Sequence, residues 1–143
     1  MQRTCLGLVF YVDQNLDSNK FVKPLKALGV HVERHRDHFA SNEADVRWIP
    51  YTAQKGWVAM TTDKKIKLSE AERQAIIQAQ ARMLFLHQKQ DLPIEKLAAN
   101  FVKTFPEIRQ FFEGCVAPCL ASLRRPSDPR VKGPGTVYEI RLK

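Results

Sequence analysis

The sequence lacks several features that would assign it to a specialised class of protein. No apolar run approaches the roughly 20 residues of a membrane-spanning helix, and no repeat with a fixed period is present. The six glycines form neither a GxGxxG nor a GxxxxGK(S/T) phosphate-binding loop, which argues against nucleotide-binding folds of those types. Only a short apolar run precedes Asp13, which makes a poor signal peptide and favours a soluble, cytoplasmic protein.

Cysteine is scarce as well. Cys5, Cys115 and Cys119 are odd in number and have no CxxC spacing, so we expect them to be reduced and structural rather than metal-binding. No Ser-His-Asp or Cys-His arrangement of a covalent catalyst can be placed along the chain.

The composition is that of a globular domain with a basic surface. The 143 residues are 44% hydrophobic and 27% charged, which predicts a single domain over 1–143. We expect its core over about 8–113 and a basic extension over about 114–143. Lys and Arg number 23 against 15 Asp and Glu, and the resulting net charge of +8 favours a polyanionic partner such as nucleic acid.

Short apolar runs alternate with helical patterns over the first two thirds of the chain. Such runs are typical of strands buried on both faces of a parallel sheet, so the pattern predicts an α/β fold. Pro50 is expected to kink or restart the second helix, and Ser69 with Glu72 to form a capping box for the third. The expected strands cover 8–12, 30–33, 57–61 and 82–86, and the expected helices end near Gly29, Gly56 and Gln80.

The pattern changes after Asp91. A helical stripe covers 94–101, and the Thr-Phe-Pro-Glu segment at 104–107 suits the start of a second helix that ends at Gly114. Two short strands are expected at 119–123 and 136–141. The sequence therefore predicts C-terminal helices followed by a short hairpin.

Acidic residues fall where the first and third strands end. Asp13 follows the first strand, Asp63 follows the third, and Asp45 stands where the intervening helix begins. Because parallel strands end at one edge of a sheet, these carboxylates would face one crevice. Carboxylates on a cationic protein would repel a phosphodiester unless a divalent ion such as Mg²⁺ or Mn²⁺ lay between them.

Each of these acids also has a simpler interpretation. Asp13 suits a turn that uses its side chain on local amides, Asp45 suits the first turn of a helix, and Asp63 could stabilise a loop. Three further acids are expected to be solvent-exposed: Asp17, Asp37 and Glu43.

Three segments, taken together and in this order, resemble the PIN-like domains, and most closely the subgroup related to VapC-type toxins. They are 12–16 (VDQNL), 45–48 (DVRW) and 56–64 (GWVAMTTDK). The resemblance covers roughly residues 8–87. It implies a three-layer α/β/α sandwich and an endoribonuclease that depends on Mg²⁺ or Mn²⁺, with metal-assisted attack of water on phosphorus. It also implies an RNA substrate and an antitoxin protein that covers the acidic edge.

The resemblance gives Asp13, Asp45 and Asp63 the roles of catalytic acids and metal ligands. Family members of the usual kind carry a fourth acid shortly after the third, where this chain has Lys64-Lys65-Ile66-Lys67. This departure puts a two-metal mechanism in doubt. Asp37 could supply the missing carboxylate if its loop folds over the edge.

Several other side chains could contact RNA. Lys64, Lys65 and Lys67 flank the proposed centre and would either grip phosphates or be solvated. Asn15 would orient the attacking water or stabilise the turn. Arg36 belongs to a basic cluster that suits a phosphate contact.

The same segment holds His35 and His38, which lack a third zinc ligand and fit a phosphate contact or a neutral surface role better. Trp48 and Trp57 would stack on bases or, as we expect, pack in the core. Phe111 and Phe112 would serve a homodimer or, as we expect, be buried in their own chain.

Two other functions fit the same acids. One is an RNA-binding module with little catalysis, favoured by the lysines at the place of the fourth acid. The other is a receiver-like phosphotransfer domain, although Gln14 stands where its second acid would be expected.

Overall fold

The described part of the chain forms a six-stranded sheet. The computed structural model describes residues 8–39, 45–63, 69–87, 92–126, 130 and 133–140, with only the backbone given for residues 45–47 and 63. The strand order is β2-β1-β3-β4-β5-β6, with parallel pairing throughout except between β5 and β6. The strands are β1 (Val9–Val12), β2 (His31–Arg34), β3 (Val58–Asp63), β4 (Arg82–His87), β5 (Cys119–Arg124) and β6 (Thr136–Ile140).

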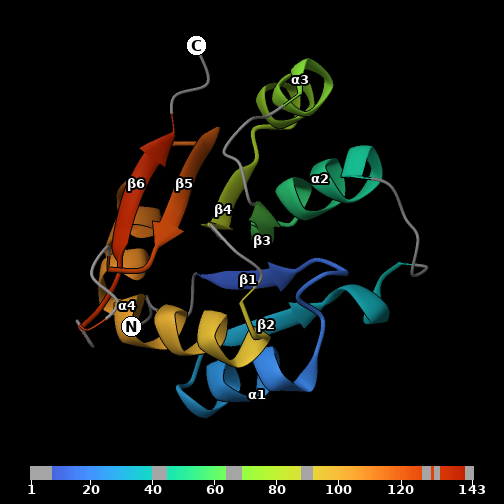
Figure 1. Ribbon diagram of the computed structural model, residues 1–143. Coiled ribbons are helices and arrows are strands. Elements are labelled where there is room, and N and C mark those ends of the chain that lie inside the picture. The colour runs from blue at the N-terminus through green and yellow to red at the C-terminus, as the bar shows by residue number, and fades with distance from the viewer. Residues whose placement is uncertain are drawn as a thin grey trace, which may run out of the picture.

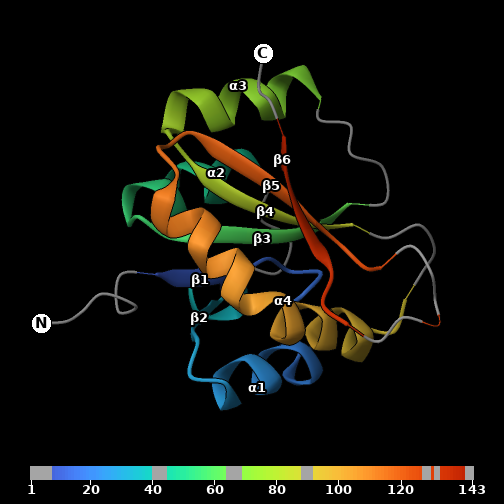
Figure 2. The same ribbon diagram turned by 90° about the vertical axis from the view of Figure 1, so that its left-hand side faces the viewer.

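Two pairs of helices cover the two faces of this sheet (Figures 1 and 2). Helices α1 (Asn19–Ala27) and α4 (Ile94–Gly114) pack together on one face, and α2 (Asp45–Gln54) and α3 (Glu70–Ala79) on the other. This three-layer arrangement confirms the predicted α/β/α fold class, with its mainly parallel sheet and terminal hairpin.

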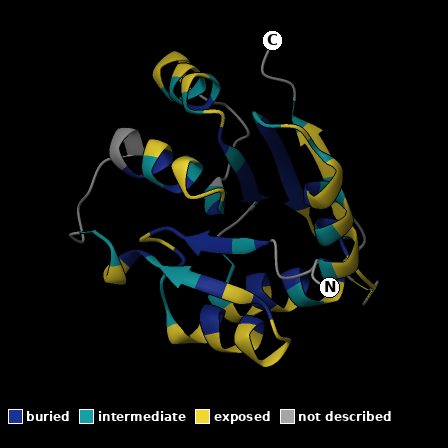
Figure 3. Ribbon diagram, turned by 180° about the vertical axis from the view of Figure 1, so that it is seen from behind, coloured by how far each residue is buried: buried dark blue, intermediate teal, exposed yellow. Residues whose placement is uncertain are grey.

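The central strands are buried from both sides (Figure 3). Phe10 belongs to the apolar cluster under α1 and α4, whereas the next residue, Tyr11, belongs to the cluster under α2 and α3. Both are fully buried. Strand alternation thus explains the continuous apolar runs, since each face of the sheet has its own core.

Capping residues fix where the first and third helices begin and end. The Ser18 hydroxyl accepts from the Lys20 amide at the start of α1, and Gly29 follows its end with a φ of +96°. Ser69 and Glu72 form the predicted capping box of α3. These local signals were predictable because each depends on residues close together in the sequence.

Neither of the two prolines considered from the sequence divides its helix. Pro50 lies inside α2, and Pro106 lies inside α4, a single helix of 21 residues. The prediction of two separate helices after Asp91 is therefore wrong. Figure 2 shows α4 bending part-way along, as the missing amide hydrogen and the bulk of a proline ring require. Thr104, expected to cap a second helix, is buried and accepts instead from the Gly135 amide at 2.8 Å.

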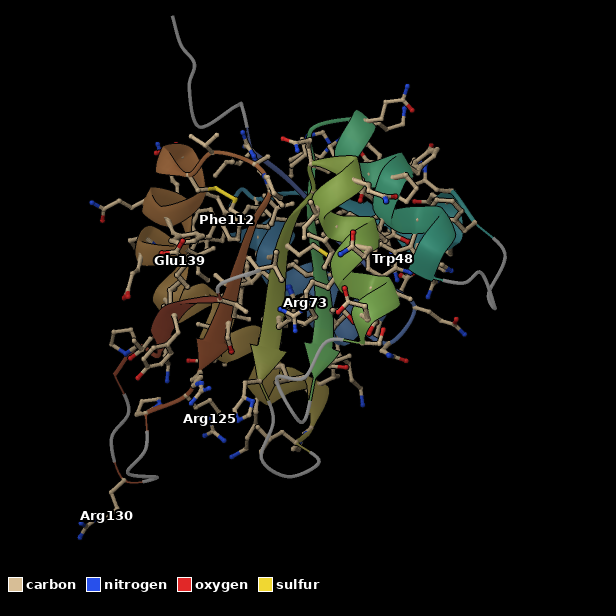
Figure 4. The ribbon with its side chains drawn as sticks, turned by 90° about the horizontal axis from the view of Figure 1, so that it is seen from above. Trp48, Arg73, Phe112, Arg125, Arg130 and Glu139 are labelled. Carbon is tan, nitrogen blue, oxygen red and sulfur yellow. A yellow bond between two sulfur atoms is a disulfide. The ribbon has the colours of Figure 1, made fainter. Side chains whose placement is uncertain are left out.

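The cysteine prediction also needs correction. Cys115 and Cys119 form a disulfide between the end of α4 and the start of β5 (Figure 4), whereas Cys5 lies outside the described residues. Three residues separate the two cysteines along the chain, and the turn between them brings their Cα atoms to 6.5 Å. Phe112 is buried as expected, and Phe111 packs against the same cluster.

Gly135 anchors the hairpin to α4. A Cβ atom at this position would meet the carbonyl oxygen of Arg124 and would lie 2.7 Å from Oδ1 of Asn100. The backbone approaches too closely here for any side chain.

We expect Gly135→Ala to lower the free energy of unfolding by about 1–3 kcal/mol, because the backbone of β5 must move to admit the methyl group. Thermal and urea unfolding measure this change. Gly114→Ala is the matched control, since a Cβ atom at Gly114 meets nothing within 4 Å. Equal stability of the two variants would contradict the close approach.

Candidate functional site

The candidate site lies where the parallel strands end. The Asp13 amide donates to the Met60 carbonyl at 3.1 Å, which continues the pairing of β1 with β3 by one residue. The chain order also reverses here, because β2 lies on one side of β1 and β3 on the other. In open α/β sheets this switch point is the usual place for a ligand.

The carboxylate of Asp13 is held in a fixed orientation. The residue is only 5% exposed. Its Oδ1 accepts from the Leu16 amide at 3.2 Å, and its Oδ2 accepts a short hydrogen bond from Oγ1 of Thr61. In both bonds the carboxylate is the acceptor, as an ionised aspartate must be.

The other two proposed acids are placed by their backbone. Asp63 is the last residue of β3, two positions after Thr61 and in register with His87. Asp45 is the first residue of α2, the helix that leads into β3. Their side chains are not described, so the meeting of the three carboxylates stays a prediction.

The lysines proposed to bind RNA, Lys64, Lys65 and Lys67, lie outside the described residues. Among the side chains that are described, no group of three or more His, Cys, Asp or Glu could hold a metal ion.

Asp17 organises the basic cluster, and the expectation that it is solvent-exposed is wrong. Its side chain is 6% exposed and forms ion pairs with Nε of Arg34 at 2.7 Å and Nε of Arg36 at 3.2 Å. Burial by itself raises the pKa of Asp17, but the Arg34 hydrogen bond, the Arg36 amide and the charge of Arg34 outweigh it and lower that pKa. Arg36 remains exposed at the edge.

A cavity of about 490 Å³ adjoins this cluster. It lies beside the loop after β1, next to the Asp13 turn. Its lining residues are Gln14, Asp17, His35, Arg36 and Phe39.

The two histidines of the basic cluster serve the structure. His35 is 2% exposed, and its Nδ1 hydrogen-bonds the Tyr11 hydroxyl, so the surface role expected for it is wrong. His38 bonds Oε1 of Glu33 at 2.8 Å and the Tyr51 hydroxyl at 3.0 Å. The hydrogen bond from His38 is the main reason that the pKa of Glu33 is lowered, with His31 adding to it against the opposing effect of burial.

The remaining candidates divide between surface and core. Asn15 is exposed in the turn after Asp13, and Asp37 is exposed in the short 3-10 helix η2 (His35–Asp37) that follows β2. Trp48 is 3% exposed, and Trp57 packs against the same cluster, as the core interpretation predicted.

Sequence reasoning missed Thr61, the residue that orients Asp13. Its position in the strand before Asp63 was visible, but its contact with Asp13 depends on the register between β1 and β3. That register joins residues 48 positions apart and has no local signal.

Comparison with known proteins gives the family of this chain. The family model described as "PIN like domain" matches residues 8–88, which span the strands β1 to β4 and the candidate acids. The chain belongs to the PIN-like domain family. It is 28% identical over 102 residues to the Mycobacterium tuberculosis (strain ATCC 25618 / H37Rv) protein named "Putative ribonuclease VapC45". That alignment covers 68% of this chain and 73% of the relative.

No solved structure matches the chain significantly. Within the described residues of this PIN-like domain, no helix has the length and apolar character needed to cross a membrane.

We expect Asp17→Asn to lower the free energy of unfolding at pH 7 by about 1.5–3 kcal/mol, since charge-assisted bonds to two arginines are lost. The folded-state pKa of Asp17 is below its ordinary value, so its contribution is complete above about pH 4 and fades as pH falls through the folded pKa. Urea unfolding of both proteins from pH 7 to pH 2.5 measures this difference. A difference that stays constant down to pH 2.5 would exclude the ion pairs as its origin.

Proposed function

We propose that this PIN-like domain is a divalent-metal-dependent endoribonuclease, and that it acts in the cytoplasm as the toxin of a toxin–antitoxin pair. The observation that carries the proposal is the buried carboxylate of Asp13, hydrogen-bonded on both oxygens at the switch point of the sheet. The family of the chain and the ribonuclease name of its relative support the same class of reaction.

Asp13, Asp45 and Asp63 would hold Mg²⁺ or Mn²⁺, because carboxylate oxygens are the ligands that these hard cations prefer. When bound, such an ion supplies Lewis-acid chemistry to phosphodiester hydrolysis. The Thr61 hydroxyl and the Leu16 amide fix the direction of the Asp13 carboxylate before the ion arrives.

Cationic side chains around the acids would bind the RNA backbone. Arg36 is exposed near Asp13, and Asp17 restrains it through its amide and its guanidinium. Lys64, Lys65 and Lys67 follow Asp63 in the sequence, and Asn15 could orient the attacking water. The net charge of +8 would draw RNA to this surface.

The relative's name also suggests a protein partner. We propose that an antitoxin covers the acidic edge and blocks access of RNA to it. A homodimer is a further proposed assembly, although Phe111 and Phe112, considered for it from the sequence, pack against their own chain's core.

We expect Asp13→Asn and Asp63→Asn to reduce Mg²⁺- or Mn²⁺-dependent cleavage of single-stranded RNA to the level of a metal-free control. Asparagine keeps the side-chain shape but removes the negative charge that the ion needs. Gel analysis of end-labelled RNA measures cleavage. Glu107→Gln, an exposed neutralisation on α4, is the control and should leave the rate unchanged.

Unchanged cleavage by both aspartate variants would refute the proposed site. Cleavage in EDTA would refute its metal dependence. Circular dichroism and thermal melting establish that each variant is folded before its rate is compared.

Thr61→Val should lower the cleavage rate by about 10- to 100-fold and raise the Mn²⁺ concentration for half-maximal activity, because the Asp13 carboxylate loses its orienting donor. Thr61→Ser keeps the hydroxyl and should restore most of the activity. Thr62→Val changes the next residue of β3 in the same way and should have little effect. Equal losses from Thr61→Val and Thr62→Val would indicate a general effect on β3 instead.

The RNA-binding module with little catalysis remains the second candidate, favoured by the lysines at 64–67 in place of a fourth acid. It predicts salt-sensitive RNA affinity without turnover in any metal. The family assignment gives no support to the receiver-like alternative.

A further inference from the structure

A single row of residues crosses the sheet from the candidate site to its far edge. Asp13 bonds Thr61 on β3, which is in register with Phe85 on β4. Phe85 is in register with Ser122 on β5, and Ser122 with Tyr138 on β6. Four strand spacings of about 4.8 Å put Tyr138 about 19 Å from Asp13 along this row.

The end of this row is exposed. Phe85 and Ser122 are 5% and 0% exposed, whereas Tyr138 is 49% exposed, one of the few large hydrophobic side chains on the described surface. In Figure 1, α2 and α3 lie on the far side of β4 from β6. The Tyr138 ring is therefore exposed to solvent on β6, beside the half of the sheet that α2 and α3 cover.

Arginines accompany this ring. The Arg124 guanidinium carbon lies 5.0 Å from the centre of the Tyr138 ring, and both Arg124 and Arg125 are exposed. Because β5 is parallel to β4, Arg124 and Arg125 lie at the carboxyl edge of the sheet, where the acids also lie. Figure 4 shows Arg125 at the end toward which β3 and β4 point.

We infer that Arg124, Arg125 and Tyr138 form a surface for single-stranded RNA, which extends the proposed cleavage site along the sheet. We call these three residues the hairpin surface. That the RNA bound there is a substrate rests on the proposed function. A base stacks on Tyr138 and the Arg124 guanidinium, and the arginines bind the adjoining phosphates.

Charge and continuity favour RNA over a protein occupant. Residues 124–143 hold six Lys and Arg against two Asp and Glu, so half of the net charge of +8 lies in this segment. An exposed aromatic ring beside cations, at the edge where the backbone would be cut, matches the way single strands are bound.

The test measures RNA affinity without cleavage. Fluorescence anisotropy of a labelled, unstructured 12-nucleotide RNA in EDTA gives Kd for the intact chain and its variants. Tyr138→Ala should raise Kd about tenfold, with an unchanged salt dependence, whereas Tyr138→Phe should bind like the parent protein.

The charge variants have a distinct signature. Arg124→Ala should raise Kd and reduce the slope of log K against log salt by about 0.7, the value for one phosphate contact on a single strand. Lys26→Ala, which removes one exposed charge on α1, is the matched control and should leave Kd within about twofold. Melting temperatures establish that the variants are folded.

The outcomes separate this inference from the proposed function. Tyr138-dependent binding without cleavage by the parent protein supports the hairpin surface while the nuclease proposal fails. Cleavage by the parent protein with Kd unchanged by both Tyr138→Ala and Arg124→Ala overturns the hairpin surface alone. Losses of RNA affinity no greater than that of Lys26→Ala would also overturn it. A change of oligomeric state in Tyr138→Ala, measured by light scattering, would overturn it by identifying an interface between copies of the chain.

Discussion

The parallel pairing of β1 with β3 is the constraint on which the candidate site depends. It brings Thr61 beside Asp13 across 48 positions of sequence and directs both strands to one edge. A carboxylate with little access to water is costly unless donors satisfy it. The Leu16 amide and the Thr61 hydroxyl meet that requirement. A solvent-exposed aspartate in a simple turn would not need both of these hydrogen-bond donors.

In this fold, basic side chains lie on two sides of Asp13. Asp17 gathers Arg34 and Arg36 beside the turn that follows Asp13. The terminal hairpin carries Arg124 and Arg125 to the same edge from the opposite side. Basic side chains therefore lie on both sides of Asp13, an arrangement that suits the proposed phosphodiester substrate. A uniformly basic surface would attract RNA without directing it to one part of the protein.

Sequence reasoning succeeded where the deciding signal was local. The buried runs predicted the strands, and the Ser69–Glu72 capping box and Gly29 marked helix ends that the structure contains. It failed where residues far apart in the sequence determine the local structure. Pro106 bends α4 without dividing it because both halves pack on one apolar cluster, and Asp17 is buried because Arg34 reaches it from β2. The position of Asp13 at a strand end was predictable, but its hydrogen bond to Thr61 was not.

The antiparallel direction of β6 has a practical consequence. All other strands run toward the acidic edge, whereas β6 returns the chain to the opposite end of the sheet, where Ile140 pairs with Leu120 near the start of β5. A sensor surface or a fluorophore attached at that opposite end of the sheet therefore leaves the carboxyl edge turned outward, available to both nucleic acid and protein. The amino-terminal side of β1 lies at that same end of the sheet, opposite Asp13.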